Sequence, residues 1–190
     1  MVFLLGLSGC ASVPMASLEQ DAKAKDFIPI PEKAALFIYR HENFGGAIPM
    51  SVMVNSKALG QTAAKTYFRL NVLPGKYSVE SHAENVSTLP LTLEAGKNYF
   101  VWQEVKMGLW MARTQLQQTD EATGRAALSE CKLIATTVSE NEVLPLGSAP
   151  VAGGNDATAK RLRELQDLRT DGVITEDEFQ KKRQEILEKL

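Results

Sequence analysis

The sequence predicts a mainly β fold, a β-sandwich with one covering helix, followed by a C-terminal two-helix hairpin. Three observations predict it: short segments rich in β-branched and aromatic residues, alternating polarity within several of them, and a highly charged C-terminal strip with helical spacing. With 190 residues, 44% of them hydrophobic, the chain can bury a core without metals or disulfides. Its 21 basic and 23 acidic residues leave no strong positive field, which argues against a nucleic-acid partner.

Seven strands are expected before the covering helix. They are residues 36–40, 50–55, 66–72, 77–82, 89–94, 97–105 and 113–118. Alternation places Phe68, Leu70 and Val72 on the core side, and likewise Leu89, Leu91 and Leu93. Between two strands, Pro74 and Gly75 occupy the middle positions of an expected type II turn.

Five segments follow from the changes in composition. They are a signal segment (1–10), a tether (11–32), the sandwich with its covering helix (33–138), a linker (139–155) and the hairpin (156–190). Pro29 and Pro31 favour an extended tether, and Pro145, Pro150 and several glycines favour a flexible linker. The covering helix is expected over residues 120–134, with Thr119 as its N-cap.

The chain opens on a short apolar run that ends in Leu7, Ser8, Gly9 and Cys10. These four residues resemble the cleavage site of bacterial lipoproteins. The resemblance implies that Cys10 becomes the mature N-terminus and carries acyl chains such as palmitate, which anchor the protein to a membrane facing the periplasm. Ala11 stands where an Asp would imply inner-membrane retention, so the outer membrane is favoured.

Two further points bear on this N-terminal segment. No Lys or Arg precedes Cys10, so we expect the signal to extend upstream of Met1. A buried or frayed segment with a chance cysteine is the alternative interpretation. No other stretch approaches the length of about 18 apolar residues that a spanning helix needs.

Four motifs, in this order, resemble the domain-of-unknown-function 2846 (DUF2846) family of bacterial lipoproteins. They are Ala35-Leu36-Phe37-Ile38-Tyr39-Arg40, Val52-Met53-Val54-Asn55 with Leu59-Gly60, Leu73-Pro74-Gly75-Lys76-Tyr77, and Leu93-Glu94-Ala95-Gly96-Lys97-Asn98-Tyr99-Phe100. The resemblance covers about residues 33 to 135. It implies a prealbumin-like or immunoglobulin-like β-sandwich in the cell envelope and no established activity.

The C-terminal strip reads as two amphipathic helices. Their apolar positions are Leu162, Leu165, Leu168, Phe179, Ile186, Leu187 and Leu190. Gly172 ends the first helix, and Thr175 with Glu178 forms a capping box that starts the second. The strip resembles the short C-terminal (SHOCT) domain, which implies oligomerisation or docking to an envelope protein partner through these residues.

A calcium loop is the alternative interpretation of the turn in this strip. Asp167, Asp171, Gly172, Ile174 and Glu178 fall at positions 1, 5, 6, 8 and 12 of an EF-hand loop. Arg169 stands at position 3, where an oxygen ligand is required, so calcium binding is disfavoured.

No motif supports catalysis, and we expect no catalytic residue, no metal site and no cofactor. His41 and His82 follow strands without partners at metal-ligand spacing, and Cys131 is expected to be a buried thiol in the covering helix. The sequence therefore predicts a non-enzymatic, lipid-anchored binding or structural module. The alternative is an envelope hydrolase or small-ligand carrier with an apolar pocket near Trp102 and Trp110.

Overall fold

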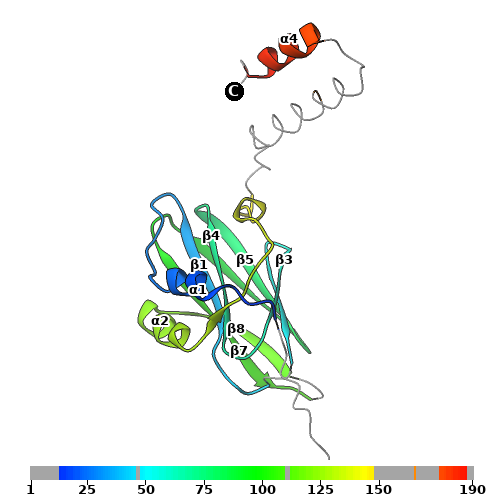
Figure 1. Ribbon diagram of the computed structural model, residues 1–190. Coiled ribbons are helices and arrows are strands. Elements are labelled where there is room, and N and C mark those ends of the chain that lie inside the picture. The colour runs from blue at the N-terminus through cyan, green and yellow to red at the C-terminus, as the bar shows by residue number, and fades with distance from the viewer. Residues whose placement is uncertain (1–12, 46–47, 110–111, 148–164, 166–175, 188–190) are drawn as a thin grey trace, which may run out of the picture. The chain divides into compact units, whose positions relative to one another are not determined.

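The computed structural model describes residues 13–45, 48–109, 112–147, 165 and 176–187 (Figure 1). The chain divides into two compact units, Met1–Gly147 and Ser148–Leu190. The first unit is a sandwich of two β-sheets, and the second contains helix α4 (Glu176–Leu187). The predicted mainly β class is confirmed.

Two sheets face each other in the first unit. One has the order β8-β7-β1-β4-β9 and the other the order β3-β2-β5-β6. The first sheet contains β1 (Ala34–Arg40), β4 (Thr66–Val72), β7 (Asn98–Met107), β8 (Ala112–Thr119) and β9 (Lys132–Leu133). The second contains β2 (Met50–Val54), β3 (Lys57–Thr62), β5 (Gly75–His82) and β6 (Val86–Leu93). All seven predicted strands are present.

Two strands were not predicted from the sequence. β3 contains Lys, Gly and Gln, which are poor strand formers, yet it pairs with β2 through a two-residue turn. Asn55 and Ser56 have φ values of +48° and +64°, as a type I′ hairpin turn requires. β9 is two residues long and pairs with β4 in parallel.

The main core lies between the sheets, and the predicted alternation is confirmed there. Phe68, Leu70 and Val72 of β4 are at most 1% exposed and belong to this core with Leu91 and Leu93 of β6. A second apolar cluster covers the opposite face of the first sheet. It contains Ala24, Ala35, Phe37, Tyr39, Tyr67, Phe100, Leu128 and Cys131. Strand β1 is therefore buried on both of its faces.

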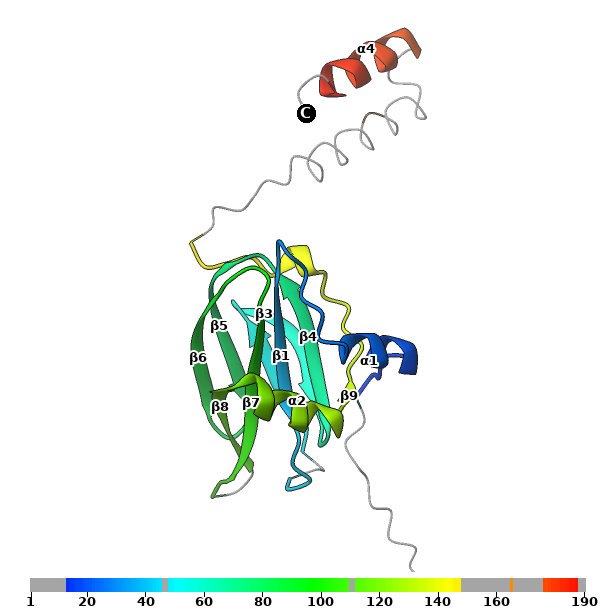
Figure 2. The ribbon, with the colours of Figure 1, turned by 90° about the vertical axis from the view of Figure 1, so that its left-hand side faces the viewer.

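Helix α2 (Glu121–Ser129) covers this outer face, as Figure 2 shows. It approaches β7 so closely that a Cβ at Gly124 would lie 2.3 Å from the Phe100 ring. The predicted helix over residues 120–134 is too long and its predicted cap is wrong. Asp120, rather than Thr119, caps it by accepting a 2.9 Å hydrogen bond from the Thr123 amide. The helix ends at Ser129 because the residues after Cys131 pair with β4 instead.

The predicted tether and linker are both partly folded. Helix α1 (Leu18–Ala24) lies within the predicted tether, and Val13, before it, is only 8% exposed. The short helix η1 (Glu140–Glu142) begins the predicted linker, and the Leu146 amide donates a 2.7 Å hydrogen bond to the carbonyl of Lys76. Residues 13–32 of the predicted tether and 139–147 of the predicted linker therefore pack against the sandwich.

The predicted type II turn at Pro74 and Gly75 is also wrong. Gly75 has a φ of +148°, whereas that turn requires about +80°, and it is already the first residue of β5. A Cβ at Gly75 would lie 2.5 Å from the Cβ of Pro145. Glycine is thus required here by the close approach of residues 143–146 as well as by its positive φ.

Candidate functional site

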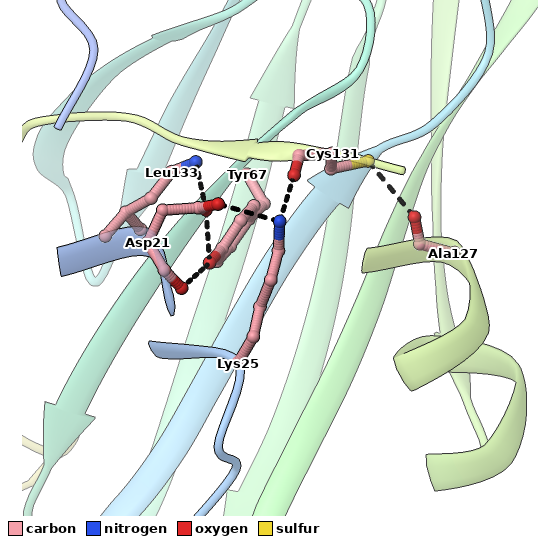
Figure 3. A network of polar contacts seen from close by, with 6 residues as sticks. All are labelled: Asp21, Lys25, Tyr67, Ala127, Cys131 and Leu133. Carbon is pink, nitrogen blue, oxygen red and sulfur yellow. Dashed lines mark hydrogen bonds and ion pairs between the residues drawn. The ribbon is translucent and has the colours of Figure 1, made fainter. Parts of the chain in front are cut away.

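A connected polar cluster holds the N-terminal segment to the first sheet (Figure 3). We call residues 13–27 the N-terminal strap. Asp21 on α1 accepts hydrogen bonds through Oδ1 from the Tyr67 hydroxyl and from the Leu133 amide, both at 2.9 Å. Its Oδ2 pairs with Lys25 Nζ at 2.8 Å, and the same Nζ donates to the Cys131 carbonyl at 2.6 Å. Three segments of the chain, residues 21–25, Tyr67 and residues 131–133, meet at this one ion pair.

The strap is fixed along its whole length. Met15 forms a β-bridge with Ile134, and the amides of Ala16 and Ala135 donate to the carbonyls of Leu133 and Pro14. After α1, the Phe27 ring packs 5.4 Å from that of Phe37 and 5.9 Å from that of Phe100. The strap therefore forms part of the folded unit from its first described residue.

Burial and hydrogen bonding act in opposite directions on Asp21. Burial raises the pKa of this carboxyl, but hydrogen bonds from Lys25, Tyr67 and the Leu133 amide outweigh burial and hold the pKa below the usual 3.8. Burial, with the neighbouring Asp21 carboxylate, raises the pKa of Tyr67. The Tyr67 hydroxyl thus keeps its proton and remains a donor to Asp21.

Cys131 follows α2 rather than lying within it, and it is a buried free thiol, as the sequence predicts. Its Sγ lies 3.3 Å from the Ala127 carbonyl, and its side chain packs in the outer-face cluster. Burial raises the pKa of this thiol to about 12. A thiol that stays protonated at neutral pH is a poor nucleophile.

A polar groove of about 310 Å³ lies beside the strap, between α1, β4 and the segment that begins at β9. Its polar lining residues are Gln20, Lys23, Arg69, Asn71 and Thr136. Lys23 and Arg69 are both cationic, and no carboxylate is among the residues that line the groove. The sequence alone did not point to this groove, because its walls come from three separated segments.

The sequence suggested an apolar pocket near Trp102 and Trp110. The structure has an apolar hollow of about 270 Å³, lined by Phe44, Gly45, Ile48, Met107, Gly108, Leu109 and Ala112. Trp110 lies outside the described residues. Trp102 instead donates a 2.7 Å hydrogen bond from Nε1 to Glu42, and its ring lies tilted against that of His41 with the centroids 5.2 Å apart. Several lining residues of the hollow are therefore close to the two tryptophans in the sequence, but Trp102 does not line it.

The two histidines lie on different sheets and do not come together. His41 packs between Tyr39 and Trp102, and His82 Nε2 lies 3.1 Å from Glu80. Among the described residues, no three His, Cys, Asp or Glu side chains are grouped to hold a metal ion.

Several predicted site residues fall outside the described part of the chain. They are Leu7, Ser8, Gly9, Cys10, Leu162, Leu168 and Leu190, with all of the calcium-loop residues except Glu178. Leu165 and Phe179 of the hairpin are described and are 9% and 6% exposed. Ile186 and Leu187 lie in α4. Within the part of the chain that the structure describes, no helix is both long enough and apolar enough to cross a membrane.

Comparison with known proteins identifies the family. Residues 31–115 match the family described as protein of unknown function (DUF2846), and residues 160–187 match the short C-terminal domain. An uncharacterized protein from Haemophilus influenzae is 35% identical over 130 residues, covering 67% of this chain and 77% of the relative. The chain therefore belongs to the DUF2846 family and carries a short C-terminal domain after its β-sandwich.

Proposed function

We propose that the protein is a non-catalytic binding or structural module of the cell envelope, anchored by lipid at Cys10. In this proposal the C-terminal hairpin mediates oligomerisation or docking to a partner. The proposal of a lipid anchor rests on the position of the strap. Val13 is buried and Met15 forms a β-bridge with Ile134, so the sandwich holds the chain from three residues after Cys10 onward.

The strap also sets how far the sandwich would lie from the membrane. Cys10 and Val13 are three residues apart, a span of at most about 11 Å in an extended chain. Because the strap is bonded to β9, the length of the predicted tether is not available as a spacer. A lipid on Cys10 would therefore hold the sandwich close to the bilayer surface, in whichever membrane the protein resides.

Two observations support a non-catalytic role. The Cys131 thiol is buried and its pKa is raised to about 12, which removes the one described cysteine as a nucleophile. A second polar cluster lies between the sheets, where the side chains of Thr62, Gln103, Ser81 and Thr114 form a chain of hydrogen bonds of 2.5 to 2.6 Å. The Thr62 hydroxyl also donates a 3.3 Å hydrogen bond to the Met50 carbonyl. All four side chains are at most 2% exposed, so this cluster offers nothing to a substrate.

Cell fractionation with metabolic labelling by radioactive palmitate tests the anchor. We expect Cys10→Ala to release the protein from the membrane fraction and to abolish labelling. Cys131→Ala is the matched control, because it removes the other cysteine from the buried cluster and should leave both membrane binding and labelling unchanged. A Cys10→Ala protein that still sediments with membranes would refute the anchor.

The apolar hollow favours a second candidate function, a carrier of a small apolar ligand. Its described lining offers no nucleophile or general base, so it supports a carrier rather than a hydrolase. Titration with a fluorescent fatty-acid analogue tests this candidate. Binding should be saturable and should be lost in Ile48→Trp, which fills the hollow. Binding that Ile48→Trp leaves unchanged would exclude the hollow as the ligand site.

A further inference from the structure

The groove beside the strap is lined by two positively charged side chains, and the elements that carry them are fixed in the fold. Arg69 projects from β4, a strand bonded on both sides within its sheet, and Lys23 lies in the last turn of α1. Asp21 fixes α1 to β4 and β9, so the two cations are carried by elements that are held together. The groove volume of about 310 Å³ is at the lower end of the range of small-molecule sites.

Within the part of the chain that the structure describes, no ion pair joins Lys23 or Arg69 to a carboxylate. Nε of Arg69 is buried and has no hydrogen-bond acceptor, although buried donors normally have one. The Arg69 guanidinium lies 5.7 Å from the centre of the Phe37 ring. This cation–π contact stabilises the guanidinium and leaves its charge in place.

The carboxylates of α1 do not serve this groove. Asp21 is used by Tyr67, Leu133 and Lys25. Glu19 lies four residues before Lys23, where an ion pair is common on a helix, yet none forms between them. Lys25 differs from them, because it pairs with Asp21, whereas no described carboxylate pairs with Lys23 or Arg69.

We propose that this groove binds a phosphate-type oxyanion. The planar guanidinium of Arg69 can donate two parallel hydrogen bonds to phosphate oxygens, and Lys23 supplies a mobile point charge at the rim. Gln20 contributes its amide Nε2, since its Oε1 already accepts a 3.0 Å hydrogen bond from the Ser17 amide. A phosphate fills part of the groove, which leaves room for a group attached to it.

Calorimetric titration of the full-chain Cys10→Ser protein with inorganic phosphate tests the site. This variant cannot be lipidated at Cys10, so the result is independent of the anchor proposal. We expect saturable binding that weakens at least tenfold in Arg69→Gln and severalfold in Lys23→Gln. Arg113→Gln and Lys76→Gln remove one exposed positive charge elsewhere on the sandwich and should leave the affinity unchanged.

Lys23 is exposed, so Lys23→Gln keeps the test valid if Arg69→Gln disturbs the fold. Absence of phosphate binding by the parent, or equal weakening in the two control variants, would overturn the proposal. Equal affinity in the parent, Arg69→Gln and Lys23→Gln would overturn it as well.

The phosphate group could belong to a lipid headgroup or to a soluble compound, and a second measurement on the same variants distinguishes the two. Co-sedimentation with phosphatidylglycerol vesicles, compared with phosphatidylcholine vesicles, tests a lipid headgroup. Binding to the anionic vesicles that is lost in Arg69→Gln and competed by inorganic phosphate identifies a headgroup site. Phosphate binding without vesicle binding identifies a soluble phosphorylated compound.

Discussion

One carboxylate, that of Asp21, joins segments that lie far apart in the sequence. Its partners Tyr67 and Leu133 are 46 and 112 residues away. Nothing local distinguishes Asp21 from the other acids of the strap, so its role could not be predicted from spacing. A local signal did exist for the helix that carries it. Ser17 and Gln20 form a capping box, with hydrogen bonds of 3.0 and 3.1 Å between side chains and backbone amides.

Replacing Asp21 by Asn should destabilise the protein by about 1 to 3 kcal/mol at pH 7, because Lys25 and Tyr67 lose a charged acceptor. The folded protein holds the pKa of Asp21 below 3.8, so the unfolded chain takes up the proton first as the pH falls. The stabilisation from ionised Asp21 is therefore full above about pH 5 and is lost as the pH falls through the pKa of the folded protein.

Urea unfolding of the parent and Asp21→Asn at pH 7 and at pH 3 measures this difference. We expect the difference in unfolding free energy to shrink at pH 3. Glu19→Gln is the control, since Glu19 is exposed on the same helix and should show no such loss. A difference for Asp21→Asn that stays equal at both pH values would mean that the ionised carboxylate is not what stabilises the strap.

At the scale of elements, alternation of polar and apolar residues was sufficient to predict the long strands. It was not sufficient to predict the segments that pack on them. β4 was predicted at its observed bounds because every second residue faces the core. β9 and the end of α2 were not, because Lys132 and Leu133 follow a helix in sequence and become a strand only by pairing with β4. Tertiary pairing overrides local propensity there.

The segment of residues 143–146 gives a prediction at this scale. Gly75→Val should lower the free energy of unfolding by about 1 to 3 kcal/mol, because a β-branched residue is strained at this φ and its Cβ would overlap Pro145. Gly147→Val is the matched control. Gly147 has a φ of +78°, but a Cβ there meets nothing within 4 Å, so only the backbone strain remains. Thermal unfolding measures both variants.

A larger loss in Gly75→Val than in Gly147→Val would show that residues 143–146 pack on the sandwich in solution. Equal losses would mean that the contact with Pro145 contributes nothing. The buried side chain of Val143, 1% exposed, favours the first result. The burial of Val143 also shows why the glycines and prolines of this segment were a poor guide to the start of the linker. Composition indicates where a chain can bend, but it does not indicate whether the segment packs on the sandwich.

At the scale of the whole molecule, the order of motifs was enough to predict the DUF2846 family and the short C-terminal domain. The groove was not predictable in the same way. Its walls come from α1, β4 and the residues after β9, and only the folded chain brings Lys23 next to Arg69. Single-chain patterns identify elements, whereas a site assembled from three of them depends on how they pack.

The hairpin supplies the last prediction, which is self-association of the whole chain. Leu165 and Phe179 are almost fully buried, yet the strip carries seven large apolar residues at helical spacing, more than two short helices can cover between themselves. At about 25 cal/mol per Å², even a few hundred Å² of apolar surface removed from water favours weak association.

Analytical ultracentrifugation should compare residues 11–190 with residues 11–147. The shorter protein ends at 147 rather than at 138, where the predicted sandwich ends, because Val143 and Leu146 belong to the sandwich. We expect the sedimentation coefficient to rise with concentration only for the longer protein, since only it retains the hairpin. If both sediment as monomers at tens of micromolar, the hairpin does not pair with a second copy, and its apolar positions are covered either by the chain itself or by a different protein.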